Sequence, residues 1–157
     1  MTMRAPPRKH AQRGTAAVEL GLLALPLAVL TFGTTEFGRA LHQYDTLAKN
    51  VRDAARYQTT ATPGVTLAAR CLALSGTAAN SGSACTGTPL LPGLTLAQIS
   101  VCDRLSCAST HNLQQTGRGV VNLVTVTITG YQFTSMVPFA VPSFTFGAVS
   151  ATMVQPL

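Results

Sequence analysis

A long apolar segment near the N-terminus dominates the hydropathy pattern. Residues 20–35 contain no charged side chain, and Glu19 is the one charged residue among residues 15–35. As an α-helix, these 21 residues would extend about 32 Å, close to the roughly 30 Å thickness of the hydrocarbon core of a bilayer. We therefore expect a transmembrane helix over residues 15–35. We expect it to kink at Pro26, which has no amide to donate to the Leu22 carbonyl.

The helical pattern continues beyond the apolar segment. Apolar side chains recur at steps of three and four residues, which places them on one face of a helix. We expect this amphipathic continuation to cover residues 36–60 and to end before the Pro63-Gly64 pair, because Pro and Gly break helices. The expected apolar stripe consists of Phe37, Leu41, Tyr44, Ala48, Val51 and Ala55.

Residues 61–157 have the pattern of a mixed domain. A short second helix is expected at residues 65–74, and residues 75–92, rich in Gly, Ser and Thr, are expected to form a loop. Strands are predicted at residues 94–101, 120–129 and 144–154. In the second of these, Val and Ile alternate with Thr. The pattern predicts an α+β fold, in which a long kinked N-terminal helix packs on a small antiparallel β-sheet.

Charge is concentrated at the N-terminus. The formal net charge is +6, and Arg4, Arg8, Lys9 and Arg13 supply four of the positive charges. Basic residues stay in the cytoplasm, so residues 1–14 are expected to be a cytoplasmic leader, disordered over residues 1–13, and residues 61–157 an exported domain. A nucleic-acid surface needs clustered Lys and Arg, and the rest of the chain has seven basic and five acidic residues without such a cluster. We therefore expect no nucleic-acid partner.

Three interpretations of the N-terminal segment compete. A cleaved secretory signal needs a small-residue cleavage site after the apolar stretch, where this chain has TFGTT at residues 31–35. A plain signal anchor leaves Glu19 unexplained, because a carboxylate in a membrane helix costs about 2–3 kcal/mol. A type IV prepilin-like leader has Gly before the cut and Glu at the fifth position after it, which is the spacing of Gly14 and Glu19. The pair is also compatible with an ordinary helix start, where Glu is favoured by the helix dipole.

Three sequence blocks carry a family resemblance. They are RGTAAVEL at residues 13–20, FGTTEFGRAL at residues 32–41 and NVRDAARY at residues 50–57. In this order and spacing they strongly resemble the TadE-like family, minor pilins (pseudopilins) of the tight-adherence (Tad, or Flp) pilus. A weaker similarity covers the alternating Val and Thr run that leads to Tyr131 and Phe133. Leu20, where the family usually has Phe, and the four cysteines depart from the family pattern.

The resemblance implies a structural role rather than an enzymatic one. A prepilin peptidase would cut between Gly14 and Thr15, and Glu19 would then face the terminal amine of a neighbouring subunit. The implied partners are that peptidase, other pilin subunits, the pilus assembly machinery and the inner membrane, with no cofactor. The implied location is the bacterial inner membrane, with the C-terminal domain in the periplasm, and in part the pilus itself. The runner-up is an uncleaved scaffold protein that stays in the membrane.

Four cysteines lie in the second half of the chain. In an oxidising compartment they are expected to form disulfides, and proximity in sequence favours Cys71 with Cys85 and Cys102 with Cys107. The rival is a metal site, since Cys102, Cys107 and His111 are close in sequence, although structural zinc prefers four ligands.

A hydrolytic site is the remaining alternative. It would use Ser106, His111 and Asp103 in a membrane-anchored periplasmic enzyme. Nothing around these three residues resembles a nucleophile elbow or an oxyanion turn.

Overall fold

The structure, a computed structural model, describes residues 11–117 and 119–156. Most of the expected cytoplasmic leader, residues 1–10, lies outside the described residues. The chain divides into two compact units. One comprises the residues up to Gly38 together with Ser135–Pro142, and the other comprises Arg39–Thr134 and the residues from Ser143 onward. Both helices and antiparallel strands are present, which confirms the α+β class.

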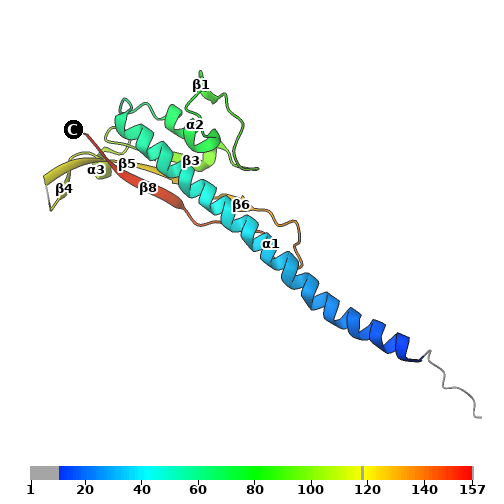
Figure 1. Cartoon of the computed structure of the whole chain (residues 1–157). Helices are drawn as coiled ribbons and strands as arrows, with labels where there is room; N and C mark the ends of the chain where they lie inside the picture. Colours follow the sequence, from blue (N-terminus) through cyan, green and yellow to red (C-terminus); the bar gives the residue numbers. More distant parts are fainter. Residues whose placement is uncertain (1–10, 118, 157) are drawn as a thin grey trace, which may run out of the picture. The chain divides into compact units, whose positions relative to one another are not determined.

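Helix α1 runs over Ala11–Thr60 (Figure 1). Its end agrees with the prediction, because the next residues lead into Pro63-Gly64. Its start does not, since residues 11–13 are helical where disorder was expected. A Gly in a helix costs only about 1 kcal/mol relative to Ala, and three helix-compatible residues follow Gly14. The helix also continues through Pro26. Membrane helices tolerate proline because the carbonyl that loses its amide partner finds other hydrogen-bond donors nearby.

The second helix and the loop after it follow the prediction closely. Helix α2 covers Leu67–Ser75 and ends at Gly76, whose φ of 73° allows its amide to bond to the Leu72 carbonyl at 2.9 Å. The expected loop contains a small hairpin of β1 (Asn80–Ser81) and β2 (Ala84–Cys85).

Two of the three predicted strands are shorter than expected. The first half of the strand expected at 94–101 is the 3₁₀ helix η1 (Leu96–Gln98), and only β3 (Ile99–Cys102) is extended. A capping box closes η1, in which Gln98 accepts from the Thr95 amide at 2.8 Å. The strand expected at 144–154 divides into β7 (Phe144–Thr145) and β8 (Val149–Gln155) on either side of Gly147. The remaining elements are α3 (Ala108–His111), β4 (Gln114–Thr116), β5 (Gly119–Ile128) and β6 (Gln132–Phe133).

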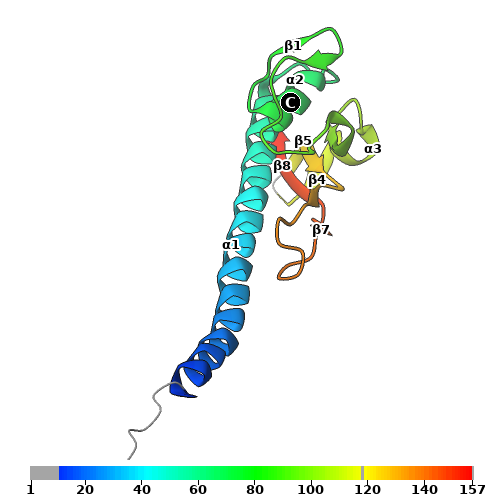
Figure 2. The same ribbon diagram turned by 90° about the vertical axis from the view of Figure 1, so that its right-hand side faces the viewer.

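Strand β5 organises the sheet. Its C-terminal half pairs with β3, its first residues pair with β4, and residues 122–128 pair with β8, all antiparallel. The predicted alternation is confirmed, because Val124, Val126 and Ile128 are buried while the threonines between them are partly exposed. Strands β6 and β7 form a separate antiparallel pair. Figures 1 and 2 show β8 alongside the C-terminal half of α1.

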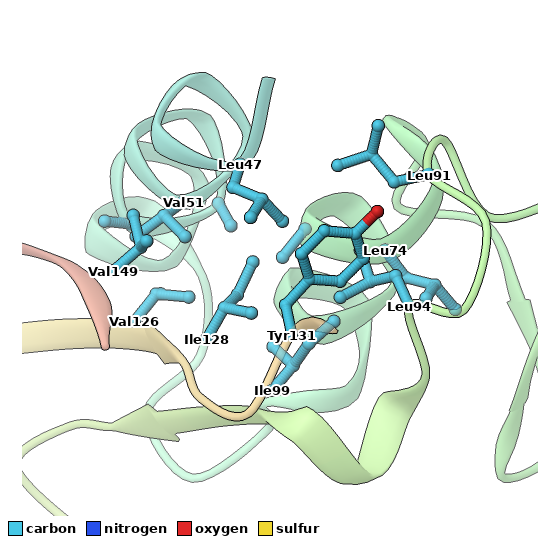
Figure 3. Close-up of a cluster of buried hydrophobic side chains, with 13 residues drawn as sticks. Leu47, Val51, Leu74, Leu91, Leu94, Ile99, Val126, Ile128, Tyr131 and Val149 are labelled. Carbon is cyan, nitrogen blue, oxygen red and sulfur yellow. The ribbon is translucent and has the colours of Figure 1, made fainter. Parts of the chain in front are cut away.

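One hydrophobic core joins the C-terminal half of α1, α2 and the sheet. Leu47 and Val51 of α1 meet Val126, Ile128 and other residues of the sheet (Figure 3). Among the residues that the structure describes, thirteen are buried in this core, including Leu74, Leu91, Leu94, Ile99, Tyr131 and Val149. The core therefore depends on residues between 47 and 149, and no single segment of the chain forms it alone.

The buried face of α1 overlaps the predicted apolar stripe only in part. Val51 and Ala55 of the stripe are buried in the core, as expected, but other stripe residues are not. Phe37, Leu41 and Tyr44 are exposed, whereas Leu47, which is outside the stripe, is fully buried. The buried face includes three amide side chains, so a prediction that follows only apolar residues does not identify it. It consists of Ala40, Gln43, Leu47, Asn50, Val51, Ala54, Ala55 and Gln58.

The cysteines pair as their spacing predicted. Cys71 of α2 is bonded to Cys85 of β2, and Cys102 at the end of β3 is bonded to Cys107. The first bond fastens the β1–β2 hairpin to α2, and the second closes the short loop before α3.

Candidate functional site on the N-terminal helix

Gly14, Thr15 and Glu19 lie on the exposed first turns of α1. A side chain at Gly14 would meet nothing within 4 Å, and all three residues are solvent-exposed. They border a shallow hollow together with Val18. The four positions share one side of the helix, since residues four apart lie one above the other. The Gly14–Thr15 peptide bond and the Glu19 side chain are therefore accessible to another protein.

The apolar segment that follows is bare in the isolated chain. Its most hydrophobic 18-residue window has a mean hydropathy of 1.9, and none of it is buried within the protein. A single soluble chain does not normally expose this much contiguous apolar surface. By length and composition this helix is able to cross a membrane. Its exposed large side chains are Val18, Leu20, Leu22, Leu23, Leu25, Leu27, Val29, Leu30 and Phe32.

Three threonines at the end of the segment hide their hydroxyl groups in the helix itself. Thr31 donates to the Leu27 carbonyl at 2.8 Å, and Thr34 and Thr35 both donate to the Thr31 carbonyl, at 3.0 and 2.9 Å. A hydroxyl satisfied in this way has a lower cost in an apolar environment than a free one. Their presence does not interrupt the membrane-compatible surface.

Glu36 sits directly after the apolar segment and is almost fully buried. Its Oε2 accepts the Met136 amide at 3.2 Å, from the loop Ser135–Pro142 of the same compact unit. The ring of Phe139 in that loop meets Phe32 edge-on, with centroids 6.5 Å apart. We did not predict this role for Glu36, because its partner lies 100 residues away. The available signal was a carboxylate next to an apolar segment.

Arg39 joins α1 to the segment around β6 within the second unit. Its Nη2 donates to the Thr134 carbonyl at 2.6 Å, and its guanidinium lies 4.5 Å from the centre of the Phe133 ring. This geometry is a cation–π contact. Phe133 also packs on Phe144, with centroids 5.2 Å apart. Sequence reasoning gave Arg39 no role.

Tyr131 makes a second bridge between α1 and the sheet. Its hydroxyl lies 3.1 Å from Oε1 of Gln43 and 3.2 Å from the Pro92 carbonyl, so the single proton is shared between them. Burial raises the pKa of Tyr131, and the nearby positive charge of Arg39 opposes that rise only in part. The hydroxyl therefore stays protonated and acts as a donor.

The geometry supports neither the metal site nor the hydrolytic site that the sequence left open. Donor atoms of Cys102, Cys107 and His111 lie within 4.8 Å of one another, but both sulfurs are in a disulfide and offer no thiolate. The ring nitrogens of His111 are 2.7 Å from Thr110 Oγ1 and 2.8 Å from Thr125 Oγ1. Both ring nitrogens of His111 are therefore engaged by threonine hydroxyl groups, and the geometry does not support His111 as a base for Ser106.

Ser106 and Asp103 serve a structural purpose instead. The hydroxyl of Ser106 donates to Oδ1 of Asp103 at 2.9 Å, and the amides of Leu105 and Ser106 donate to the same oxygen. Oδ2 accepts the Gly64 amide at 2.6 Å and lies 3.4 Å from Nε2 of Gln58. Asp103 is fully buried and joins the end of α1 to the loop after β3.

Comparison with known proteins identifies the N-terminal part of the chain. Residues 14–56 match the family model described as TadE-like protein. The match begins at Gly14 and covers the apolar segment and most of the helix beyond it. No curated protein and no solved structure matches the chain.

Proposed function

We propose that this chain, which is TadE-like over residues 14–56, is a minor pilin (pseudopilin) that helps to assemble a Tad-type pilus for surface adherence. The observation that carries the proposal is the exposed Gly14–Glu19 face at the start of an unburied apolar helix. A plain membrane anchor needs the apolar helix but has no use for a glycine and a carboxylate at this spacing.

The first step would be removal of the leader. A prepilin peptidase would cut the accessible bond between Gly14 and Thr15, so that Thr15 becomes the new N-terminus. The chain itself would catalyse nothing, because it is the substrate. The basic residues before the cut would hold the leader in the cytoplasm, and the C-terminal domain would reach the periplasm.

Glu19 would act in the second step, which is assembly. Its carboxylate would face the new amine of Thr15 on a neighbouring pilin subunit. Away from water the two charges attract more strongly than in solution, and a pair with one correct geometry fixes the register between helices. The bare apolar surface beyond Glu19 would then exchange lipid contacts for contacts with neighbouring pilin helices.

N-terminal sequencing of the protein purified from native membranes tests the cleavage. We expect the mature chain to begin at Thr15. Gly14→Val should leave the precursor intact, while Gly21→Val, at an equally unobstructed glycine of the same helix, should be processed normally. A native terminus at Met1 would contradict cleavage and favour the membrane-retained scaffold.

Replacement of Glu19 tests the assembly step separately. We expect Glu19→Gln to keep processing and membrane insertion but to abolish most pili, counted by electron microscopy, because the amide carries no charge to pair with the Thr15 amine. Asp53→Asn, at an exposed carboxylate of the same helix, is the matched control and should leave pilus number unchanged. Normal piliation in Glu19→Gln cells would rule out the assembly role.

A further inference from the structure

The loop Ser135–Pro142 has a composition that is unusual for an exposed segment. Its sequence is SMVPFAVP, with no charged residue and with seven of the eight positions apolar. Met136 is 77% exposed and Phe139 is 73% exposed. A soluble surface loop generally turns such side chains inward, because exposing them to water is unfavourable.

Part of the backbone of this loop is hydrogen-bonded within the loop itself. The amides of Ala140 and Val141 both donate to the Val137 carbonyl, at 3.0 and 3.1 Å. Pro138 and Pro142 have no amide hydrogen. A segment that enters lipid must satisfy its backbone polar groups internally, because lipid tails offer no hydrogen-bonding partner.

Two further amides bond to side chains. Val137 donates to Ser135 Oγ at 3.1 Å, and Met136 donates to the buried carboxylate of Glu36 at 3.2 Å. Six of the eight loop positions therefore present no free amide. The largest apolar side chains of the loop, Met136 and Phe139, are exposed while Ser135 is buried, which is the reverse of an ordinary loop in water.

The loop lies against the end of the apolar helix segment. Phe139 packs edge-on against Phe32, within that segment. The surface between the loop and the helix is a shallow apolar hollow lined by Val29, Leu30, Gly33, Thr34, Phe37 and Ala140. The exposed apolar surface of the loop is thus continuous with the surface of the candidate membrane span.

We propose that Ser135–Pro142 inserts into the membrane interface on the exported side, as a second lipid contact beside α1. The occupant of this surface is the boundary between lipid headgroups and acyl chains, where Phe139 and Met136 would be immersed. Glu36 would sit at this level, with its carboxylate covered by the loop. The inference rests on membrane insertion of α1, which is part of the proposed function, but not on cleavage or pilus assembly.

Fluorescence depth measurement tests the loop directly. The chain contains no tryptophan, so Phe139→Trp gives the full-length protein a single tryptophan in the loop. In bilayers with brominated lipids, we expect blue-shifted emission that is quenched most by bromines near the ester end of the acyl chain. Leu22→Trp, inside the apolar segment, should be quenched most by bromines placed deeper. Val154→Trp, on the exposed side of β8, should not be quenched.

A charge in the loop should reverse the result. Adding Met136→Asp to Phe139→Trp should shift the emission to the red and remove the quenching, because an ionised carboxylate resists entry into lipid. Adding Ala148→Asp, at an exposed position outside the loop, should leave the quenching unchanged.

The contrary outcomes are distinct. Quenching of Leu22→Trp without quenching of Phe139→Trp would overturn the loop proposal and leave the membrane helix in place. Blue-shifted but unquenched emission from Phe139→Trp would also overturn it, and would indicate a protein contact at this surface. If Leu22→Trp were unquenched as well, both the membrane anchor and the loop proposal would fail.

Discussion

Asp103 shows how a single buried charge holds two distant segments together. Its two oxygens accept hydrogen bonds from the amides of Gly64, Leu105 and Ser106 and from the Ser106 hydroxyl. We expect Asp103→Asn to reduce the free energy of unfolding by about 1–3 kcal/mol, because one amide nitrogen would replace an acceptor and leave buried donors unpaired. Chemical denaturation of the full-length protein in detergent, followed by near-UV circular dichroism, measures the loss.

Ser106→Ala is the graded control for Asp103. It removes one hydroxyl, which donates to Oδ1 of Asp103 and accepts the Asp103 amide, but it leaves the carboxylate and the amides of Gly64, Leu105 and Ser106 paired, so its loss of stability should be smaller. Equal losses in the two variants would contradict the view that the Asp103 carboxylate joins the Gly64 turn to the loop after β3.

The same carboxylate predicts a pH dependence. Burial alone would raise the pKa of Asp103, but hydrogen bonds from Ser106, Gly64 and Leu105 outweigh it, and its pKa is below the ordinary value. Its stabilising contribution is therefore complete above the unfolded pKa of about 3.9 and is lost as the pH falls through the lower folded pKa. The stability difference between wild type and Asp103→Asn should shrink below about pH 4. A difference that stays constant on acidification would contradict this assignment.

At the residue scale, the sequence revealed local relations and missed distant ones. Gly14 and Glu19 are five positions apart, and each cysteine pair is close in sequence, so their relation is visible in the chain. Glu36 and Arg39 bond to partners 100 and 95 residues away. Nothing in the local pattern indicates such partners, and only the folded chain brings them together.

At the element scale, α1 provides the clearest test of the observed packing. Leu47 is fully buried in the core, whereas Leu41, which belongs to the expected stripe, is about half exposed. We expect Leu47→Ala to reduce the free energy of unfolding by about 2–5 kcal/mol, through lost apolar burial and the cavity left behind. Leu41→Ala, the matched control, should change it far less. The opposite order would mean that Leu41 rather than Leu47 faces the core.

The misplaced stripe has a physical explanation. Gln43, Asn50 and Gln58 are buried on the core face of α1, and a pattern based on hydropathy assigns amides to the solvent side. Gln43 accepts a hydrogen bond from Tyr131, and Nε2 of Gln58 lies 3.4 Å from Oδ2 of Asp103. The contacts of Gln43 with Tyr131 and of Gln58 with Asp103 favour this orientation, and these partners, distant in sequence, were not visible before the fold was known.

The strands also show which features could be predicted from the local sequence and which could not. β5 was predicted nearly to the residue, because it is buried on one face and its alternation is strict. The strands expected at 94–101 and 144–154 were too long, since the first begins with a capped 3₁₀ turn and the second is interrupted after Thr145. Interruptions of this kind depend on hydrogen bonds such as that from the Phe146 amide to the Tyr131 carbonyl.

At the scale of the whole molecule, the stability of the second unit depends on a modest core supported by covalent links. From residue 71 to the C-terminus only Asp103, Arg104 and Arg118 are charged, so charge pairs within this part of the unit contribute little. Each disulfide limits the freedom of the unfolded chain, and on the chain-entropy model the effect grows with the length of the closed loop. The two links span separations of 14 and 5 residues.

The loop lengths predict an order of importance for the two links. Replacing Cys71 and Cys85 together with Ser should reduce the free energy of unfolding by about 3 kcal/mol, and replacing Cys102 and Cys107 together by about 2 kcal/mol. Cys71 is fully buried, so the first double variant also leaves a hydroxyl in the core, which increases its loss further. Denaturation of both variants and of the reduced wild type measures these values. A larger loss from the Cys102–Cys107 link would show that its position beside Asp103 matters more than loop length, and that the two features act as one unit.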